Sequence, residues 1–194
     1  MRRKAIFALA PLSIVAVVAA LLVGNIKMFH FGATAPAASA SSFPAGTRAQ
    51  FAYLAAQNSN SCGLQPSTVK TYADAARIQG SCCSAMDWNH YQKQVHGLRA
   101  YRGIRVIPRD PYDIPASIAK KLFAYENSID LTSAQKIVYS RAMSITPEKG
   151  PCCCKCWRWH AFKGLSQYLI VRKHFSAHQV ANVISLVDGC GGKA

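Results

Sequence analysis

Four of the eight cysteines in this chain lie within five consecutive positions. They belong to the stretch GPCCCKCWRWH, residues 150–160, which also contains two tryptophans and a histidine. Thiols this close together are prone to oxidation, so they indicate a metal site, a redox centre or halves of several structural disulfides. These three uses make different demands on the spacing of the cysteines.

The spacing favours metal binding over disulfide bonds. Adjacent cysteines pair with each other only under strain, because a disulfide requires particular Cα and Cβ distances. Cys153 and Cys156 form a C-x-x-C pair, a spacing that lets two thiolates bind one ion. Pro151 predicts a helix start. A helix that begins there would place Cys152, Cys156 and His160 on one face, as a ridge of soft donors.

The same helix start is expected to lower the pKa of the neighbouring thiols. A helix N-terminus carries a partial positive charge, and Lys149, Lys155 and Arg158 add positive charge nearby. The thiolate form both binds metal and attacks disulfides, so this environment favours either chemistry. A thiolate-rich donor set selects soft ions, and we expect copper or mercury ahead of zinc.

The remaining cysteines supply further candidate ligands. Cys82 and Cys83 are adjacent at a turn between two expected helices, and Cys190 lies in DGCGG, where glycines allow a close backbone approach. Cys62 lies in a loop and is either bridging or free. The predicted metal-binding residues are Cys82, Cys83, Cys152, Cys153, Cys154, Cys156, Cys190 and His160.

A charge-free apolar segment near the N-terminus predicts a location outside the cytoplasm. Residues 1–4 form a basic flank, and residues 5–23 carry no charge. A helix of that length spans about 28 Å, close to the hydrocarbon thickness of a bilayer, and the basic flank should stay in the cytoplasm. We expect a single-pass anchor in the cytoplasmic membrane with the C-terminal domain outside. The alternative is a cleaved signal peptide and a secreted protein.

Composition separates a linker from the folded domain. Residues 24–46 are rich in Ala, Ser and Pro, which is typical of a flexible tether, so we expect the folded domain over residues 47–194. The net charge is +15, from 23 basic and 8 acidic residues. The densest basic group contains Arg99, Arg102, Arg105 and Arg109. Because the charges are scattered, we expect a solvated basic surface or contact with anionic lipid headgroups and no nucleic-acid partner.

Helical periodicity dominates the folded domain and predicts an all-α bundle of about six helices. No pattern typical of a β-hairpin is present, and a helix is expected from Pro66 to Gly80. Capping boxes begin at Thr132 and at Ser176, each with Gln three residues later. The prolines of residues 108–115 predict an extended linker with its two aspartates in turns.

These features favour a membrane-anchored metal-binding protein that sequesters or transfers a soft ion, with a metal donor or acceptor protein as its partner. No P-loop, dinucleotide fingerprint, G-x-S-x-G or H-E-x-x-H motif is present, so we do not expect an enzyme. A thiol–disulfide redox protein using Cys153 and Cys156 is one alternative, although the sequence lacks a thioredoxin-like βαβ pattern. A disulfide-stapled binding domain is the other.

The stretch Pro151–Cys156 fits the pattern P-C-x-C-x-C and resembles the PCYCGC-motif family of exported bacterial proteins. Cys152, Cys154 and Cys156 match the motif, whereas Cys153 stands in place of Tyr and Lys155 in place of Gly. The resemblance covers this motif and the layout of an exported helical domain with a Cys/Gly-containing end. It departs from the family in lacking a lipoprotein cysteine. It implies a bacterial envelope protein with functional thiols, and the family brings no assigned activity.

Overall fold

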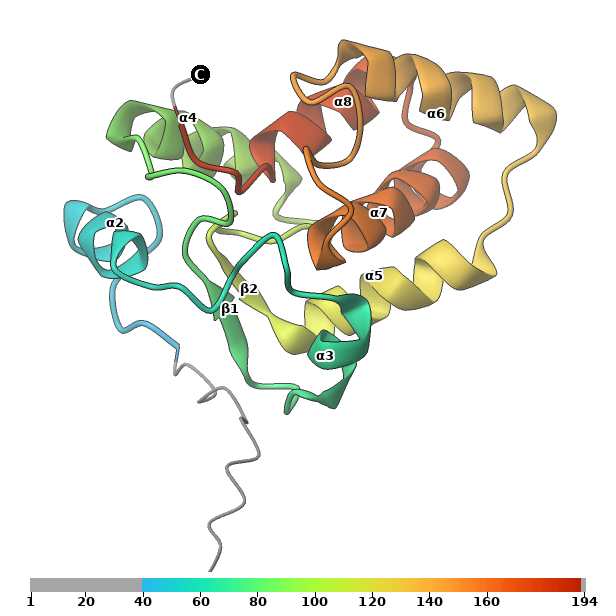
Figure 1. Ribbon diagram of the computed structural model, residues 1–194. Coiled ribbons are helices and arrows are strands. Elements are labelled where there is room, and N and C mark those ends of the chain that lie inside the picture. The colour runs from blue at the N-terminus through green and yellow to red at the C-terminus, as the bar shows by residue number, and fades with distance from the viewer. Residues whose placement is uncertain (1–39, 193–194) are drawn as a thin grey trace, which may run out of the picture. The chain divides into compact units, whose positions relative to one another are not determined.

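The computed structural model describes residues 40–192, which are mainly helical (Figure 1). The predicted basic flank, the segment 5–23 and most of the linker 24–46 lie outside the described residues. Within residues 40–192, no helix is both long and apolar enough to cross a bilayer. The elements are α2 (Arg48–Ala55), α3 (Pro66–Thr71), β1 (Arg77–Gln79), α4 (Trp88–Leu98), the 3-10 helix η1 (Arg99–Tyr101), β2 (Asp113–Pro115), α5 (Ala116–Ser128), α6 (Ser133–Ile145), α7 (Trp157–Lys173) and α8 (Ala177–Leu186).

The helical class is confirmed, but a small antiparallel sheet was not predicted. The expected helix from Pro66 to Gly80 is wrong, because α3 ends at Thr71 and Arg77–Gln79 pairs with Asp113–Pro115. Ile78 and Ile114 face each other in this register and are fully buried. Prolines favour extended backbone in the residues before them, which makes the second strand available as a partner. This pairing overrides the helical periodicity of the first segment.

The segment expected to be an extended linker is instead part of the packed domain. Asp110 and Asp113 are 4% and 7% exposed, so neither is a solvated turn residue. The Asp113 carboxylate accepts a hydrogen bond from Nε of Arg77 at 2.8 Å and so links the two strands. The segment thereby connects the sheet to the helices on either side.

Helices α5, α6, α7 and α8 pack around the larger core (Figure 1). Helix α7 packs very closely on α5 at Gly164. A β-carbon at this position would overlap the carbonyl oxygen of Leu122. Capping boxes at Thr132 and Ser176 begin α6 and α8, as the sequence predicted. A second, smaller core joins α2 to α4 through Leu54, Tyr91, Val95 and Tyr112.

Candidate metal centre

The eight cysteines converge in space from four separate segments of the chain. Overlapping groups of three thiols have Sγ atoms within 4.8 Å of one another, and these groups share members. Cys156 is connected to them by a side-chain hydrogen bond with Cys152. All eight are free thiols. We call this set the thiol cluster, and it comprises Cys62, Cys82, Cys83, Cys152, Cys153, Cys154, Cys156 and Cys190.

Cys83 is one of two points at which several sulfur atoms meet. Its Sγ atom lies 3.0 Å from that of Cys62, 3.4 Å from that of Cys82 and 3.2 Å from that of Cys153. Cys62, which the sequence left as bridging or free, therefore belongs to the cluster. A sulfur atom with three sulfur neighbours has no single disulfide partner.

Cys190 is the second such point. Its Sγ atom lies 3.1 Å from that of Cys153, 3.7 Å from that of Cys152 and 3.8 Å from that of Cys82. A tetrahedral ion with Zn–S bonds of about 2.3 Å holds its sulfur ligands about 3.8 Å apart, whereas a disulfide bond is about 2.0 Å long. The two longer distances thus match the separation of ligands around one ion.

Backbone hydrogen bonds join the loop of Cys82 to the segment of Cys190. The backbone N–H of Cys82 donates to Gly189 O at 3.1 Å, and that of Ser84 donates to Cys190 O at 2.9 Å. Gly191 has a φ of 78°, and a β-carbon there would overlap the Ser84 carbonyl oxygen. Only glycine combines this left-handed conformation with such a close approach at low cost. The glycines of DGCGG thus allow Cys190 to reach the cluster.

Hydrogen bonds at the start of α7 position two cysteine segments, the loop of Cys62 and residues 151–156. The Trp157 backbone N–H donates to Leu64 O at 2.9 Å, and its Nε1–H donates to Oδ1 of Asn60 at 2.9 Å. These bonds hold the loop of Cys62 beside residues 151–156. The prediction that a helix begins at Pro151 is wrong, because α7 begins at Trp157 and residues 151–156 are irregular. An irregular loop can direct four sulfur atoms at one centre, which consecutive helical residues cannot do.

His160 is not brought to the thiol cluster. Its Nδ1 atom lies 2.9 and 3.0 Å from the carboxylate oxygens of Glu126, which also accepts from Nζ of Lys163 at 3.3 Å. The predicted ridge of Cys152, Cys156 and His160 therefore does not form. The seven cysteines of the predicted ligand set do converge, and Cys62 takes the eighth place.

The cluster has a closed side and an open side. Two cysteines are half-buried, namely Cys82 and Cys154. The buried members are Cys152, Cys156 and Cys190, and the exposed members are Cys62, Cys83 and Cys153. An ion can therefore reach the cluster from solvent at one side and be shielded at the other.

Four cysteines of the thiol cluster have raised pKa values, and for two of them, Cys154 and Cys156, the sequence suggested lowered values. Burial is the main reason that the pKa values of Cys83 and Cys154 are raised above the usual range. A hydrogen bond with Cys152, together with burial, raises the pKa values of Cys82 and Cys156. Neighbouring thiols and partial desolvation outweigh the positive end of α7. In the absence of metal, these four cysteines remain protonated at neutral pH.

Arg158 places a buried positive charge beside the cluster. Its side chain is fully buried, with Nη2 donating to Pro111 O at 2.5 Å and Nη1 donating to Val187 O at 3.2 Å. Its Nε atom has no hydrogen-bond partner in residues 40–192, and no described carboxylate forms an ion pair with it. A β-carbon on Gly189 would overlap the guanidinium group, so the glycine before Cys190 makes room for it. The charge opposes the rise in the pKa of Cys82.

The sequence counted Arg158 only as a nearby charge and gave no sign of its burial. It also missed Glu148 and Asp188, whose oxygen atoms form a possible ligand group with the sulfur of Cys190. Asp188 accepts a hydrogen bond from the Cys190 backbone N–H at 3.1 Å. Burial and the charge of Asp188 raise the pKa of Glu148. Asp188 is two residues before Cys190, so its position in the sequence was an available signal.

Comparisons with known protein families, with curated proteins and with solved structures found no match to this chain. The resemblance to the PCYCGC-motif family therefore remains a prediction. The chemistry of the site has to be inferred from its own residues.

Proposed function

We propose that this domain binds soft metal ions through the thiol cluster, in order to sequester them or transfer them to a partner. The observation that carries this proposal is the convergence of all eight sulfur atoms, with Cys83 and Cys190 each within 3.8 Å of three others. A disulfide uses each sulfur once. Metal ions gather several sulfur ligands around one point, which is the arrangement seen here.

The buried charge of Arg158 supports metal-bound thiolates over disulfides. A buried ion without a counter-charge costs several kcal/mol, and no described carboxylate pairs with this guanidinium group. Four thiolates around a single divalent or monovalent ion leave a net negative charge beside the guanidinium group. Disulfides are neutral and would leave Arg158 uncompensated.

Among soft ions we propose copper or mercury ahead of zinc, because the donors are thiolates. Sulfur is the only donor type in four of the five candidate ligand groups, and soft thiolates select Cu(I) and similar ions. Eight thiols exceed the four ligands of one tetrahedral ion, so we expect more than one ion to be bound. The exposed cysteines can exchange ions with a partner, and the buried ones retain them.

A redox function has less support from the same geometry. An attacking thiol needs a substantial thiolate fraction. The pKa of Cys156, one member of the expected redox pair, is raised by its hydrogen bond with Cys152 and by burial, and the pKa values of Cys83 and Cys154 are raised mainly by burial. These residues are therefore poorly suited to begin disulfide exchange.

Native mass spectrometry of the full-length chain tests the proposal. The protein is purified anaerobically in a nonionic detergent without chelator or reductant. We expect a mass excess that identifies the ion and its number. The double substitution Cys152→Ser/Cys190→Ser should reduce this excess, because it removes two buried ligands. His160→Gln is the matched control and should keep the metal, since this imidazole bonds to Glu126.

Two results would contradict the proposal. One is a metal-free wild-type chain whose mass is reduced by two hydrogen atoms for each of several disulfides. The other is a mass excess that persists unchanged in the cysteine variant. Far-ultraviolet circular dichroism of each variant shows whether the helices are retained, so that loss of ligands is distinguished from loss of the fold.

We further propose that the domain lies outside the cytoplasmic membrane of a bacterium. The apolar residues 5–23 behind a basic flank and the motif of Pro151–Cys156 support this placement. Alkaline phosphatase fused after residue 192 should be active in whole cells, because this enzyme folds only in an oxidising compartment. An inactive fusion would contradict the placement.

A further inference from the structure

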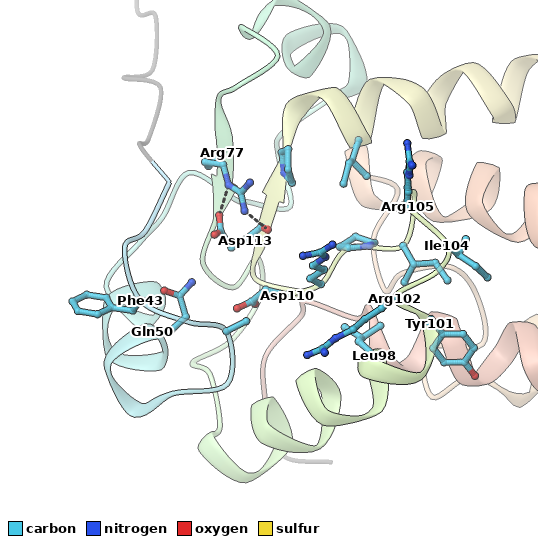
Figure 2. Close-up of a pocket in the computed structure, with 16 residues that line it drawn as sticks. Phe43, Gln50, Arg77, Leu98, Tyr101, Arg102, Ile104, Arg105, Asp110 and Asp113 are labelled. Atoms are coloured by element: carbon cyan, nitrogen blue, oxygen red, sulfur yellow. Dashed lines mark hydrogen bonds and ion pairs between the residues drawn. The ribbon is translucent and has the colours of Figure 1, made fainter.

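Four arginines in η1 and in the segment after it line two adjoining cavities. The first has a volume of about 310 Å³ and the second of about 570 Å³. Both are lined by Arg102 and Arg109, together with Ala45 and Leu98. Of these two cavities, Arg105 lines only the first and Arg99 only the second. Figure 2 shows the first cavity.

These arginines have no counter-charge in the described part of the chain. Arg99, Arg102, Arg105 and Arg109 are exposed, and none forms an ion pair with a carboxylate of residues 40–192. By contrast, Arg77 in the wall of the same cavity is paired with Asp113 at 2.8 Å. The positive charge around the two cavities is therefore available to an external anion.

The other acidic group of the first cavity is occupied by internal hydrogen bonds. The Asp110 carboxyl group accepts from the Tyr91 hydroxyl at 2.6 Å and from the Tyr112 backbone N–H at 3.0 Å. In Figure 2 it points towards Gln50 and away from Arg102. Burial raises the pKa of Asp110, which further limits its negative charge. The Asp110 carboxyl group therefore does not neutralise the arginines.

The walls between the arginines are partly apolar. Figure 2 shows the side chains of Arg102 and Arg105 leaving the chain in opposite directions, with Ile104 between them in sequence. The aliphatic residues that line the first cavity are Leu98, Ile104, Ile107 and Ile118. A ligand that fits these walls has an apolar part as well as an anionic group.

We propose that these cavities bind a phosphate ester that carries an apolar substituent. The phosphate lies between Arg102 and Arg109, which line both cavities, and the apolar part occupies the cavity of about 310 Å³. Guanidinium groups bind phosphate through two parallel hydrogen bonds, and several of them match its double charge better than that of a carboxylate. This site does not depend on the metal-binding function.

A membrane lipid headgroup and a soluble phosphate ester share this ligand chemistry. Isothermal titration calorimetry of the full-length chain in a nonionic detergent at low ionic strength tests the anionic part and the apolar part of the ligand. The probes are hexyl phosphate, inorganic phosphate and hexanol. We expect hexyl phosphate to bind and hexanol not to bind, because the charge is essential. Tighter binding of hexyl phosphate than of inorganic phosphate supports the proposal, and equal binding would overturn it, because the apolar part of the ligand would then contribute nothing.

The variant Arg102→Gln/Arg109→Gln should weaken the binding of hexyl phosphate at least tenfold. Arg141→Gln/Arg172→Gln is the matched control, because it removes the same charge from exposed positions outside the cavities and should retain binding. Unchanged far-ultraviolet circular dichroism of both variants shows that the fold is intact. The proposal is overturned if no phosphate probe binds, or if the two variants lose affinity equally, which indicates a diffuse basic surface.

Discussion

Two buried ionisable side chains determine much of the electrostatics of this domain at the scale of single residues. Arg158 is a cation whose described hydrogen bonds are to the backbone carbonyls of Pro111 and Val187. Asp110 is an acid held by hydrogen bonds from Tyr91 and Tyr112. Neither burial is visible in the sequence, because isolated charged residues are most often exposed. Their effects are nevertheless measurable by substitution.

Replacing Arg158 by Met should weaken metal binding at least tenfold, because the variant lacks the positive charge that compensates bound thiolates. Arg158→Lys keeps the charge and should retain more of the affinity. Competition with a chromophoric chelator under anaerobic conditions measures both. Equal affinities in Arg158→Met and the wild type would show that the guanidinium group has only a structural role in packing on Gly189.

Asp110→Asn should remove a pH dependence of stability. An unfolded aspartate ionises near pH 3.8, whereas burial raises the pKa of the folded Asp110 and keeps its proton to higher pH. As the pH rises above 3.8, the unfolded state loses this proton first, so the unfolding free energy of the wild type falls until the folded pKa is passed. The slope is at most about 1.4 kcal/mol per pH unit.

Urea unfolding of both proteins between about pH 4 and pH 7 measures this difference. The wild type should lose stability relative to Asp110→Asn as the pH is raised. Asp130→Asn serves as the control, since it removes a carboxyl group from an exposed position. A constant difference between the wild type and Asp110→Asn would contradict the assigned direction of the pKa shift.

At the scale of elements, the sequence predicted the helices that carry their own start signals. The capping boxes at Thr132 and Ser176 are local, and both begin the helices expected of them. The predicted helix start at Pro151 is wrong, because a proline permits a helix without requiring one. The end of the loop is instead held at Trp157, which donates hydrogen bonds to Asn60 and Leu64. The sequence did not predict the strand at Arg77–Gln79, because the strand with which it pairs is distant in sequence.

The segment after α8 provides a test of how elements position the ligands. Gly191→Ala should displace Cys190, because the new β-carbon would overlap the Ser84 carbonyl oxygen at a φ of 78°. We expect a loss of about 1–3 kcal/mol in stability and a reduced metal content. Thermal unfolding and elemental analysis measure the two effects.

Gly103→Ala is the matched control, because a β-carbon there meets no atom within 4 Å. It should leave both the stability and the metal content nearly unchanged. Equal behaviour of the two alanine variants would show that the cluster tolerates movement of Cys190, and that its position is not set by this close backbone approach.

At the scale of the whole molecule, the thiol cluster joins four chain segments whose cysteines lie outside the helices and strands. The sequence predicted seven of its eight members from residue type alone, because clustered cysteines in a helical domain suggest shared ligands. It could not predict which sulfur atoms meet, because the distances between Cys62, Cys83 and Cys153 depend on how the helices pack. The kind of ligand could therefore be predicted from the sequence, whereas the grouping of the sulfur atoms in space could not.

Removing the proposed metal should loosen these segments more than the helical core. A ligand that binds only the folded state stabilises it by an amount that grows with its concentration. We expect a reduced, chelator-treated protein to unfold at a lower temperature and to exchange amide hydrogens faster in residues 60–64, 81–86, 151–156 and 189–192. Helices α5 and α7 should stay protected, since Gly164 lets them pack closely.

Hydrogen exchange followed by mass spectrometry, before and after metal removal under reducing conditions, measures this pattern. Uniform loss of protection over the whole domain would show that the cluster supports global folding. Unchanged exchange in the four segments would show that they are held by backbone hydrogen bonds such as that from Cys82 to Gly189 O.

The order of the four segments along the chain also has a consequence for biosynthesis. Cys62, Cys82 and Cys83 leave the ribosome early, whereas the sulfur of Cys190, which lies next to Cys82, is made only after α8. A nascent chain thus exposes its first thiols before the centre they belong to can form. Those thiols therefore stay open to oxidation until translation has passed residue 190.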